Sequence, residues 1–290
     1  MTRKLTADCA LELDMELGEG AFWDASRDSL VWVDILRREI HELKGGAHRV
    51  HSLPSHVGVA APRGRGGWVC AVREGFAAFD PENARFEVLA DVELPGVRMN
   101  DGNVDPRGRF FAGSMLDTEE PGGGRVYRLD ADLTVSVVLE PVDLSNGVDW
   151  SADGRTVYYV DSGPDRAVAT FDFDLDAGTW TNRREFARLS EREGYPDGLT
   201  VDRDGCIWVA VWAGSEVRRY TPGGKLDAVV SVPAPLVTSC GFGGPGLETL
   251  YLTTARTTLS QAVLAANPLS GSLFAVQPGV AGFARRPFLG

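Results

Sequence analysis

Cysteine is scarce in this sequence, and the few cysteines are widely spaced. The 290 residues include four, Cys9, Cys70, Cys206 and Cys240, and no two of them form a CxxC pair. Isolated cysteines argue against a disulfide framework and against a thiolate zinc site. We therefore expect four free thiols in a reducing compartment.

Positive charge is also in short supply. The chain has 29 Lys and Arg residues against 41 Asp and Glu residues, which gives a net charge of -12. Nucleic acids and anionic membranes both attract clustered basic side chains, so we expect neither as a partner. An acidic surface is compatible with cation binding, but by itself it is weak evidence for it.

Long apolar runs are missing as well. No stretch approaches the roughly 20 residues of a membrane-spanning helix. Acidic residues interrupt positions 1–19, so the sequence does not predict the apolar core of a signal peptide. We expect a cytoplasmic protein with a single domain over residues 1–290. The sequence leaves its oligomeric state open between monomer and dimer.

Two common catalytic motifs are absent too. The sequence contains no Gly-x-Ser-x-Gly, so a nucleophile elbow is unsupported. The run Gly122-Gly123-Gly124 lacks the Lys and Ser/Thr that complete a phosphate-binding loop. We interpret this run as an ordinary loop.

What the sequence does contain is a repeat of a turn followed by an aromatic, strand-like run. Successive aromatic residues are separated by 36, 43, 48, 49 and 43 positions. A period of about 40–50 residues with several short strands is typical of a β-propeller. The sequence therefore predicts an all-β, six-bladed β-propeller with four antiparallel strands per blade; a two-sheet sandwich is the alternative. The six aromatic markers are Trp32, Trp68, Phe111, Tyr159, Trp208 and Tyr251.

The sixth repeat lacks an obvious outer strand after residues 271–276. The alternating segment at residues 10–13 could supply it. We therefore expect the N-terminal strand to close the ring, which would remove an exposed sheet edge. No stretch convincingly predicts a helix.

A residue followed by glycine recurs at one position of all six repeats. Each glycine lies 9 to 12 residues before its aromatic marker, which is the length of one strand plus one turn. The dipeptides should therefore start the innermost strands, where the crowded axis favours a residue without Cβ. The preceding side chains would then ring one mouth of the channel. The six dipeptides are Glu19-Gly20, Val57-Gly58, Asp101-Gly102, Asn146-Gly147, Asp197-Gly198 and Cys240-Gly241.

Four of these six positions carry hard oxygen atoms: Glu19, Asp101, Asn146 and Asp197. Carboxylates and an amide converging on one point would suit Ca²⁺, Mg²⁺, Mn²⁺ or oxygen-bound Zn²⁺. The alternative is that they are turn residues, because Asn-Gly and Asp-Gly are common in hairpins. Their recurrence in register favours a metal site.

Several motifs of the chain resemble those of the regucalcin (senescence marker protein)/gluconolactonase family. They run in the same order over nearly the whole sequence. The resemblance implies a six-bladed propeller that holds one divalent cation and hydrolyses sugar lactones, such as gluconolactone, to aldonic acids. Ca²⁺ or Zn²⁺ is the expected cation, with Mg²⁺, Mn²⁺ or Fe²⁺ as alternatives. The motifs are Leu17-Gly18-Glu19-Gly20, Arg98-Met99-Asn100-Asp101-Gly102, Ser145-Asn146-Gly147, Pro196-Asp197-Gly198 and Thr238-Ser239-Cys240-Gly241-Phe242-Gly243-Gly244.

The same resemblance implies roles for individual residues. Glu19, Asn146 and Asp197 correspond to the metal ligands, and Asp197 also to the catalytic base. Arg98 and Asn100 correspond to the residues that bind substrate. From the residues alone, Arg98 could equally well pair with the neighbouring Asp101.

Three further residues are weaker candidates. Asp101 is the remaining carboxylate of the ring. Thr118 falls near the position where animal members of the family carry a substrate-holding glutamate, and the loop that contains Glu119 suggests a different lid. Two other functions stay open, namely an organophosphate or aryl-ester hydrolase on the same metal site and a non-catalytic calcium-binding propeller.

Overall fold

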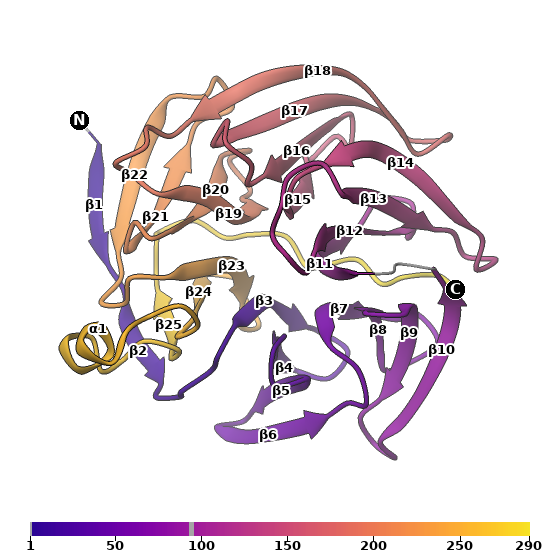
Figure 1. Ribbon diagram of the computed structural model, residues 1–290, viewed down its shortest axis with the longest axis horizontal. Coiled ribbons are helices and arrows are strands. Elements are labelled where there is room, and N and C mark those ends of the chain that lie inside the picture. Colours follow the sequence, from indigo (N-terminus) through magenta and orange to yellow (C-terminus); the bar gives the residue numbers. More distant parts are fainter. Residues whose placement is uncertain (1, 93–95) are drawn as a thin grey trace.

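Six β-sheets are arranged around a central axis in the computed structural model, which describes residues 2–92 and 96–290 (Figure 1). The first three blades are formed by β3 (Gly18–Asp24), β4 (Ser29–Asp34), β5 (Glu39–Lys44) and β6 (Ala47–Ser52); β7 (Val57–Pro62), β8 (Trp68–Val72), β9 (Gly75–Asp80) and β10 (Arg85–Asp91); and β11 (Val97–Val104), β12 (Phe110–Leu116), β13 (Gly124–Leu129) and β14 (Val135–Val142).

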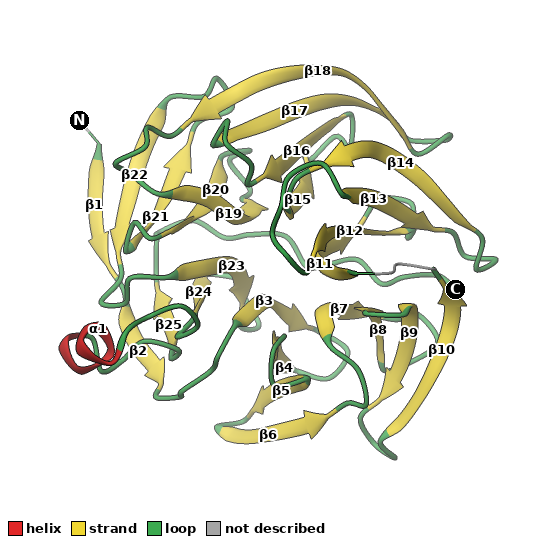
Figure 2. Ribbon diagram, in the orientation of Figure 1, coloured by secondary structure: helices red, strands yellow, loops and turns green. Residues whose placement is uncertain are grey.

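The other three blades include the two N-terminal strands. Strands dominate the whole structure, and α1 is a short helix between two strands of the last blade (Figure 2). The elements are β15 (Ser145–Trp150), β16 (Thr156–Asp161), β17 (Ala167–Asp174) and β18 (Thr179–Arg188); β19 (Tyr195–Val201), β20 (Ile207–Trp212), β21 (Glu216–Tyr220), β22 (Leu226–Ser231) and β1 (Arg3–Thr6); and β23 (Val237–Gly243), β24 (Thr249–Thr254), α1 (Gln261–Ala266), β25 (Leu273–Val276) and β2 (Asp8–Leu11). The innermost strands, at the axis, are β3, β7, β11, β15, β19 and β23. From each of them the sheet extends outward to the rim, where β1 and β2 are the outermost strands of the last two blades.

The prediction of an all-β, six-bladed propeller is therefore confirmed. Every aromatic marker lies in the second strand of its blade, and five of the six are almost completely buried between neighbouring sheets. Burying such large rings removes much apolar surface from water, which is the main force that holds adjacent blades together.

The N-terminal strand closes the ring, as predicted, but two residues earlier in the chain. Strand β2 pairs antiparallel with β25, with Asp8 opposite Ala275 and Leu11 opposite Leu273. The preceding strand β1 adds a fifth, parallel strand to the neighbouring blade by pairing with β22. The sequence analysis did not predict that strand, because a short exposed edge strand carries little apolar pattern.

Glycines let the innermost strands approach one another closely, as the spacing predicted. A Cβ added to Gly147 would lie 2.5 Å from the backbone nitrogen of Leu199 and 2.8 Å from the carbonyl oxygen of Asp197. A Cβ on Gly58 would collide with the carbonyl oxygen of Asn100. Only a residue without a side chain fits these two positions.

The C-terminal segment crosses the middle of the ring after β25 (yellow in Figure 1). It is held by backbone hydrogen bonds, including those from Gly282 N to Leu247 O (2.8 Å) and from Phe288 N to Pro62 O (2.9 Å). These bonds attach the segment to the last blade and to the second blade. The repeat pattern gave no sign of this strap.

All four cysteines are free thiols, as the sequence predicted. None of the helices that the structure describes has the length and apolar character needed to cross a membrane.

Candidate metal centre and active site

Irregular pairing at the start of each innermost strand sets the direction of the candidate site residues. The ladder between the first and second strands shifts register between Glu19 and Phe22, and between Pro196 and Leu199. The same shift occurs in the other four blades. A β-bulge re-aims side chains that regular pleating would send into the sheet packing.

The four oxygen-bearing residues predicted to converge are all buried near the end of the channel where the innermost strands begin. Asp101 is 7% exposed, and Glu19, Asn146 and Asp197 are less exposed. Burial raises the pKa of Glu19 well above its usual range, and the nearby charges of Asp197 and Asp101 raise it further. The three carboxyl groups therefore share one poorly solvated space, where like charges are costly without a cation.

Asp197 has the least satisfied carboxyl group of this cluster. Its pKa is raised well above the usual range, first by burial and then by the charge of Asp101. Its Oδ1 atom is buried and has no hydrogen-bond partner among the described residues. A buried, unpaired carboxylate oxygen is unfavourable unless a cation or a proton reaches it.

A chain of amide and hydroxyl groups links the neighbouring blades around the cluster. Asn100 donates from Nδ2 to Oδ1 of Asn146 at 2.7 Å and to the carbonyl oxygen of Ser145 at 2.9 Å. Asn146 donates from its own Nδ2 to Oγ of Ser162 at 2.7 Å. Ser162 in turn donates to the carbonyl oxygen of Pro196 at 2.6 Å, next to Asp197. This network fixes the orientation of the Asn146 amide, with its oxygen towards Asn100 and its nitrogen towards Ser162.

Arg98 lies beside this network rather than against Asp101. Its Nη1 atom donates to Oδ1 of Asn100 at 2.5 Å and to the carbonyl oxygen of Met99 at 3.2 Å. Within the described part of the chain, these bonds use one of its nitrogens, and a guanidinium has five N–H donors. Burial lowers the pKa of Arg98, and the charges of Glu19 and Glu119 oppose that shift. Its remaining donors are suited to the oxygens of a ligand.

The loop after β12 brings the two weaker lid candidates to the same face. Arg73 anchors its first residue through two hydrogen bonds to the Asp117 carboxylate, at 2.8 and 2.9 Å. Thr118 and Glu119 follow and are exposed. Glu119 is close enough for its charge to act on Arg98, whereas no hydrogen bond among the described residues joins Thr118 to the cluster.

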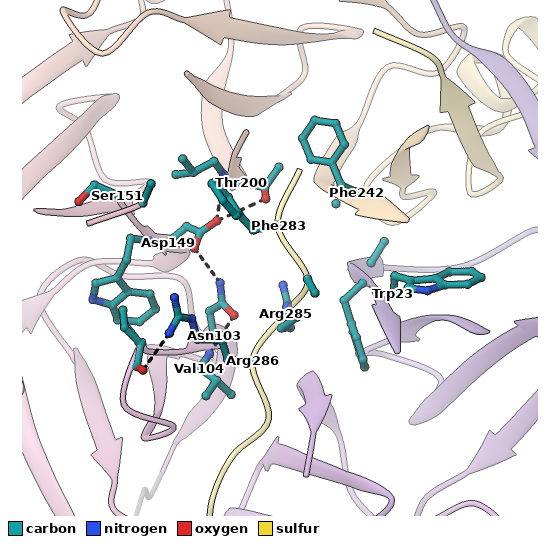
Figure 3. Close-up of a pocket in the computed structure, with 18 residues that line it drawn as sticks. Trp23, Asn103, Val104, Asp149, Ser151, Thr200, Phe242, Phe283, Arg285 and Arg286 are labelled. Carbon is teal, nitrogen blue, oxygen red and sulfur yellow. Dashed lines mark hydrogen bonds between the residues drawn. The ribbon is translucent and has the colours of Figure 1, made fainter. Parts of the chain in front are cut away.

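The other end of the channel is occupied by the C-terminal strap. Figure 3 shows Arg285 on this segment, between Asp149 and Asn103 on one side and Trp23 on the other. Its guanidinium donates to the carbonyl oxygen of Ala60 at 3.2 Å. The charges of Asp101 and Asp149 partly offset the lowering of its pKa by burial. Arg285 thus supplies positive charge to the cluster from the opposite end of the channel. A cavity of about 90 Å³ lies beside Arg285.

The donor set fits a divalent cation. Among residues 2–92 and 96–290, no three His, Cys, Asp or Glu side chains lie close enough together to hold an ion by themselves. An ion would therefore need the amide oxygen of Asn146 as well as the carboxylates. The unpaired Oδ1 of Asp197 and the clustered like charges are the observations that fit such an ion. Ligands that are all oxygen suit hard cations.

Sequence reasoning missed two residues that complete the surroundings of the cluster. Ser162 follows the second strand of its blade and belongs neither to the residue-glycine dipeptides nor to the aromatic markers of the repeat. Arg285 comes after the last blade. The only sequence signal for Ser162 was its place directly after the strand that pairs with the Asn146 strand.

The family model described as SMP-30/Gluconolactonase/LRE-like region matches residues 17–256. This protein therefore belongs to the SMP-30/gluconolactonase family, as the motifs indicated. Membership of this family supports lactone hydrolysis as the general reaction class of the protein.

Individual relatives show the range within the family. Regucalcin from Danio rerio is 37% identical over 278 residues, which cover 94% of each chain. A provisionally named sugar lactone lactonase, YvrE, from Bacillus subtilis is 32% identical and covers 98% of this chain and 99% of its own. Among solved structures, a calcium-binding regucalcin from Agrobacterium tumefaciens superposes with a TM-score of 0.94 at 29% identity, over 99% of both chains.

Proposed function

We propose that this protein is a divalent-metal-dependent hydrolase that opens sugar lactones, such as gluconolactone, to the corresponding aldonic acids. Family membership supports the lactone chemistry. The observation that carries the metal dependence is the buried Oδ1 atom of Asp197, which has no hydrogen-bond partner in the described part of the chain and lies among other acidic groups.

In this proposal Glu19, Asn146 and Asp197 hold one divalent cation, with Ca²⁺ or Zn²⁺ as the first choices. When bound, the cation would supply a Lewis acid that polarises the lactone carbonyl and stabilises the negative charge that develops on its oxygen. The calcium-binding description of the Agrobacterium regucalcin supports the presence of such an ion.

The chain's own residues then orient the substrate and move a proton. The free N–H donors of Arg98, with Asn100 beside them, hold the hydroxyl groups of the sugar and so fix the carbonyl for attack. Asp197 takes a proton from the attacking water as a general base.

Metal removal is the experiment that tests this function. Hydrolysis of several aldonolactones would be followed in a pH-stat before and after exhaustive chelation. We expect chelation to abolish the activity and one equivalent of a divalent ion to restore it. Full activity in a sample verified as metal-free would contradict the proposal.

The same assay separates the two alternatives. Hydrolysis of organophosphates or aryl esters, but not of aldonolactones, would indicate a different hydrolase on the same site. Stoichiometric calcium binding without any hydrolysis would indicate a non-catalytic propeller.

A further inference from the structure

A second cavity, of about 380 Å³, opens beside the candidate metal centre. Its size falls within the roughly 300–1,000 Å³ range of small-ligand sites. Loops from three consecutive blades form it, and its lining combines polar and apolar surface. The side chains that matter here are Glu119, Asp143, Ser162, Arg166, Glu191 and Tyr195.

Ser162 connects this cavity to the candidate centre. Its hydroxyl accepts the hydrogen bond from Asn146 (2.7 Å) and donates to the carbonyl oxygen of Pro196 (2.6 Å). Ser162 lines the cavity and also contacts Asn146, which is a proposed metal ligand. A ligand whose carbonyl group lies at the cluster would extend its other substituents past Ser162 into the cavity.

Arg166 presents a donor that the protein pairs only weakly. Its guanidinium lies 4.2 Å from the centre of the Tyr195 ring, and Nη2 donates to the Tyr195 hydroxyl at 2.6 Å. Nη1 is 4.0 Å from Glu191, whose side chain is 91% exposed, so that ion pair is weak. The Nε atom is buried and has no partner among the described residues. Arg166 lines the cavity, and its weakly paired Nη1 is the nitrogen that an acceptor on a ligand would meet.

The charge around the cavity limits which ligand can supply that acceptor. The lining of the cavity contains three carboxylates, those of Glu119, Asp143 and Glu191. It contains one guanidinium, that of Arg166. Excess negative charge disfavours a substituent that carries its own carboxylate. Hydroxyl groups suit this mixture, because each one both donates to a carboxylate and accepts from an N–H. An alkyl or aryl group would leave these polar groups without partners.

We propose that this cavity is the subsite for the hydroxylated tail of the lactone, with Arg166 as its specificity-determining residue. The inference rests on the proposed lactone hydrolysis and deepens it. It assigns the substrate to neutral, polyhydroxylated lactones, and it excludes anionic lactones and those with bare hydrocarbon substituents.

Three lactones test this selectivity: glucono-1,5-lactone, the anionic glucarolactone, and δ-valerolactone, which has the same ring without hydroxyls. For the metal-loaded wild type we expect the highest kcat/KM with gluconolactone. We expect Arg166→Gln to lower that value roughly 10- to 100-fold, because a charged donor is lost. The same variant should leave kcat/KM for δ-valerolactone within about twofold of wild type. Tyr195→Phe should have a smaller effect in the same direction.

A matched control and a binding measurement complete the experiment. Arg184→Gln removes an arginine that contacts Asp172 on the exposed rim, and it should leave all three substrates unaffected. The inhibition constant of the non-hydrolysable glucono-1,5-lactam should rise in Arg166→Gln by about the same factor as kcat/KM falls.

Each adverse outcome has a separate meaning. If Arg166→Gln lowers activity on gluconolactone and δ-valerolactone equally, the cavity does not select the tail and the inference is wrong. Rapid hydrolysis of glucarolactone by the wild type would overturn the exclusion of anionic lactones. If the wild type hydrolyses no lactone, the proposed function fails. In that case lactam binding by calorimetry, weakened in Arg166→Gln, would still support the cavity as a polyol site, and unchanged binding would overturn it.

Discussion

Asp197 and Glu19 differ from the other acidic residues of the chain in how much the fold opposes their negative charge. Both are buried, and each has another carboxyl group of the cluster nearby. The surface carboxylates that pair with arginine behave in the opposite way, since the bonded arginine lowers the pKa of Asp117 and Asp172. The structure thus keeps an unfavourable charge cluster, as binding and catalytic sites often do.

This cluster predicts an unusual dependence of stability on pH in the metal-free protein. A carboxyl group whose folded pKa is raised stabilises the fold below its ordinary pKa, and that stabilisation is lost as the pH rises through the folded value. For Glu19 and Asp197 the loss begins at the ordinary carboxyl pKa and continues up to the raised pKa of the folded state. We expect the Tm of the chelated protein to fall as the pH is raised from about 5 to about 8.

Variants test whether the cluster causes that fall. Glu19→Gln or Asp197→Asn should reduce it and raise the Tm of the chelated protein near neutral pH, at roughly 2–4 °C for each kcal/mol. The exposed Glu248→Gln is the control and should keep the wild-type dependence. A steep fall that persists in both cluster variants would show that other groups are responsible.

At the scale of elements, the two N-terminal strands have different structural consequences. Strand β1 adds a parallel edge to a blade that already has four strands of its own. Strand β2 supplies the fourth strand of the last blade and ties the start of the chain to β25. Ring closure therefore depends on β2.

Two truncations should separate these effects. Removing residues 1–6 deletes β1 alone, and we expect little change in Tm. Removing residues 1–12 also deletes β2 and opens the ring, so we expect the Tm to fall by roughly 5–10 °C, equivalent to a few kcal/mol. Thermal unfolding followed by circular dichroism would measure both. Equal melting temperatures would contradict closure by β2.

The innermost strands were the most predictable elements, because the residue-glycine spacing repeats in every blade. That spacing placed Glu19, Asn146 and Asp197 at equivalent positions, and all three are buried at the same end of the channel. The polar cavity could not be predicted in this way. Arg166 and Tyr195 lie in loops and strand starts of different blades, and only the folded ring brings them together.

At the scale of the whole molecule, the two ends of the channel have different surroundings. One end carries the oxygen cluster and opens beside the larger cavity. The C-terminal strap crosses the other end and places Arg285 near Asp149 (Figures 1 and 3), where the charges of Asp149 and Asp101 both act on it. A ligand is therefore expected to enter from the cluster end. The strap was not predictable from the repeat, since it follows the last blade and contacts residues far away in the sequence.

The proposed hydrolysis depends on Asp197 acting both as a metal ligand and as a base. The substitution Asp197→Asn keeps an oxygen for the cation but removes the proton acceptor. Asn146→Asp is the matched comparison, because it keeps the oxygen and adds charge, and it should mainly alter metal affinity. Metal analysis would verify full occupancy of each variant before any rate is compared.

The most direct test is the kcat of fully metal-loaded Asp197→Asn with gluconolactone. We predict a fall of roughly 10²–10⁴-fold, the loss typical of removing a general base. Turnover close to that of the wild type in the loaded variant would contradict the account, and Asp101, the neighbouring carboxylate, would become the candidate base.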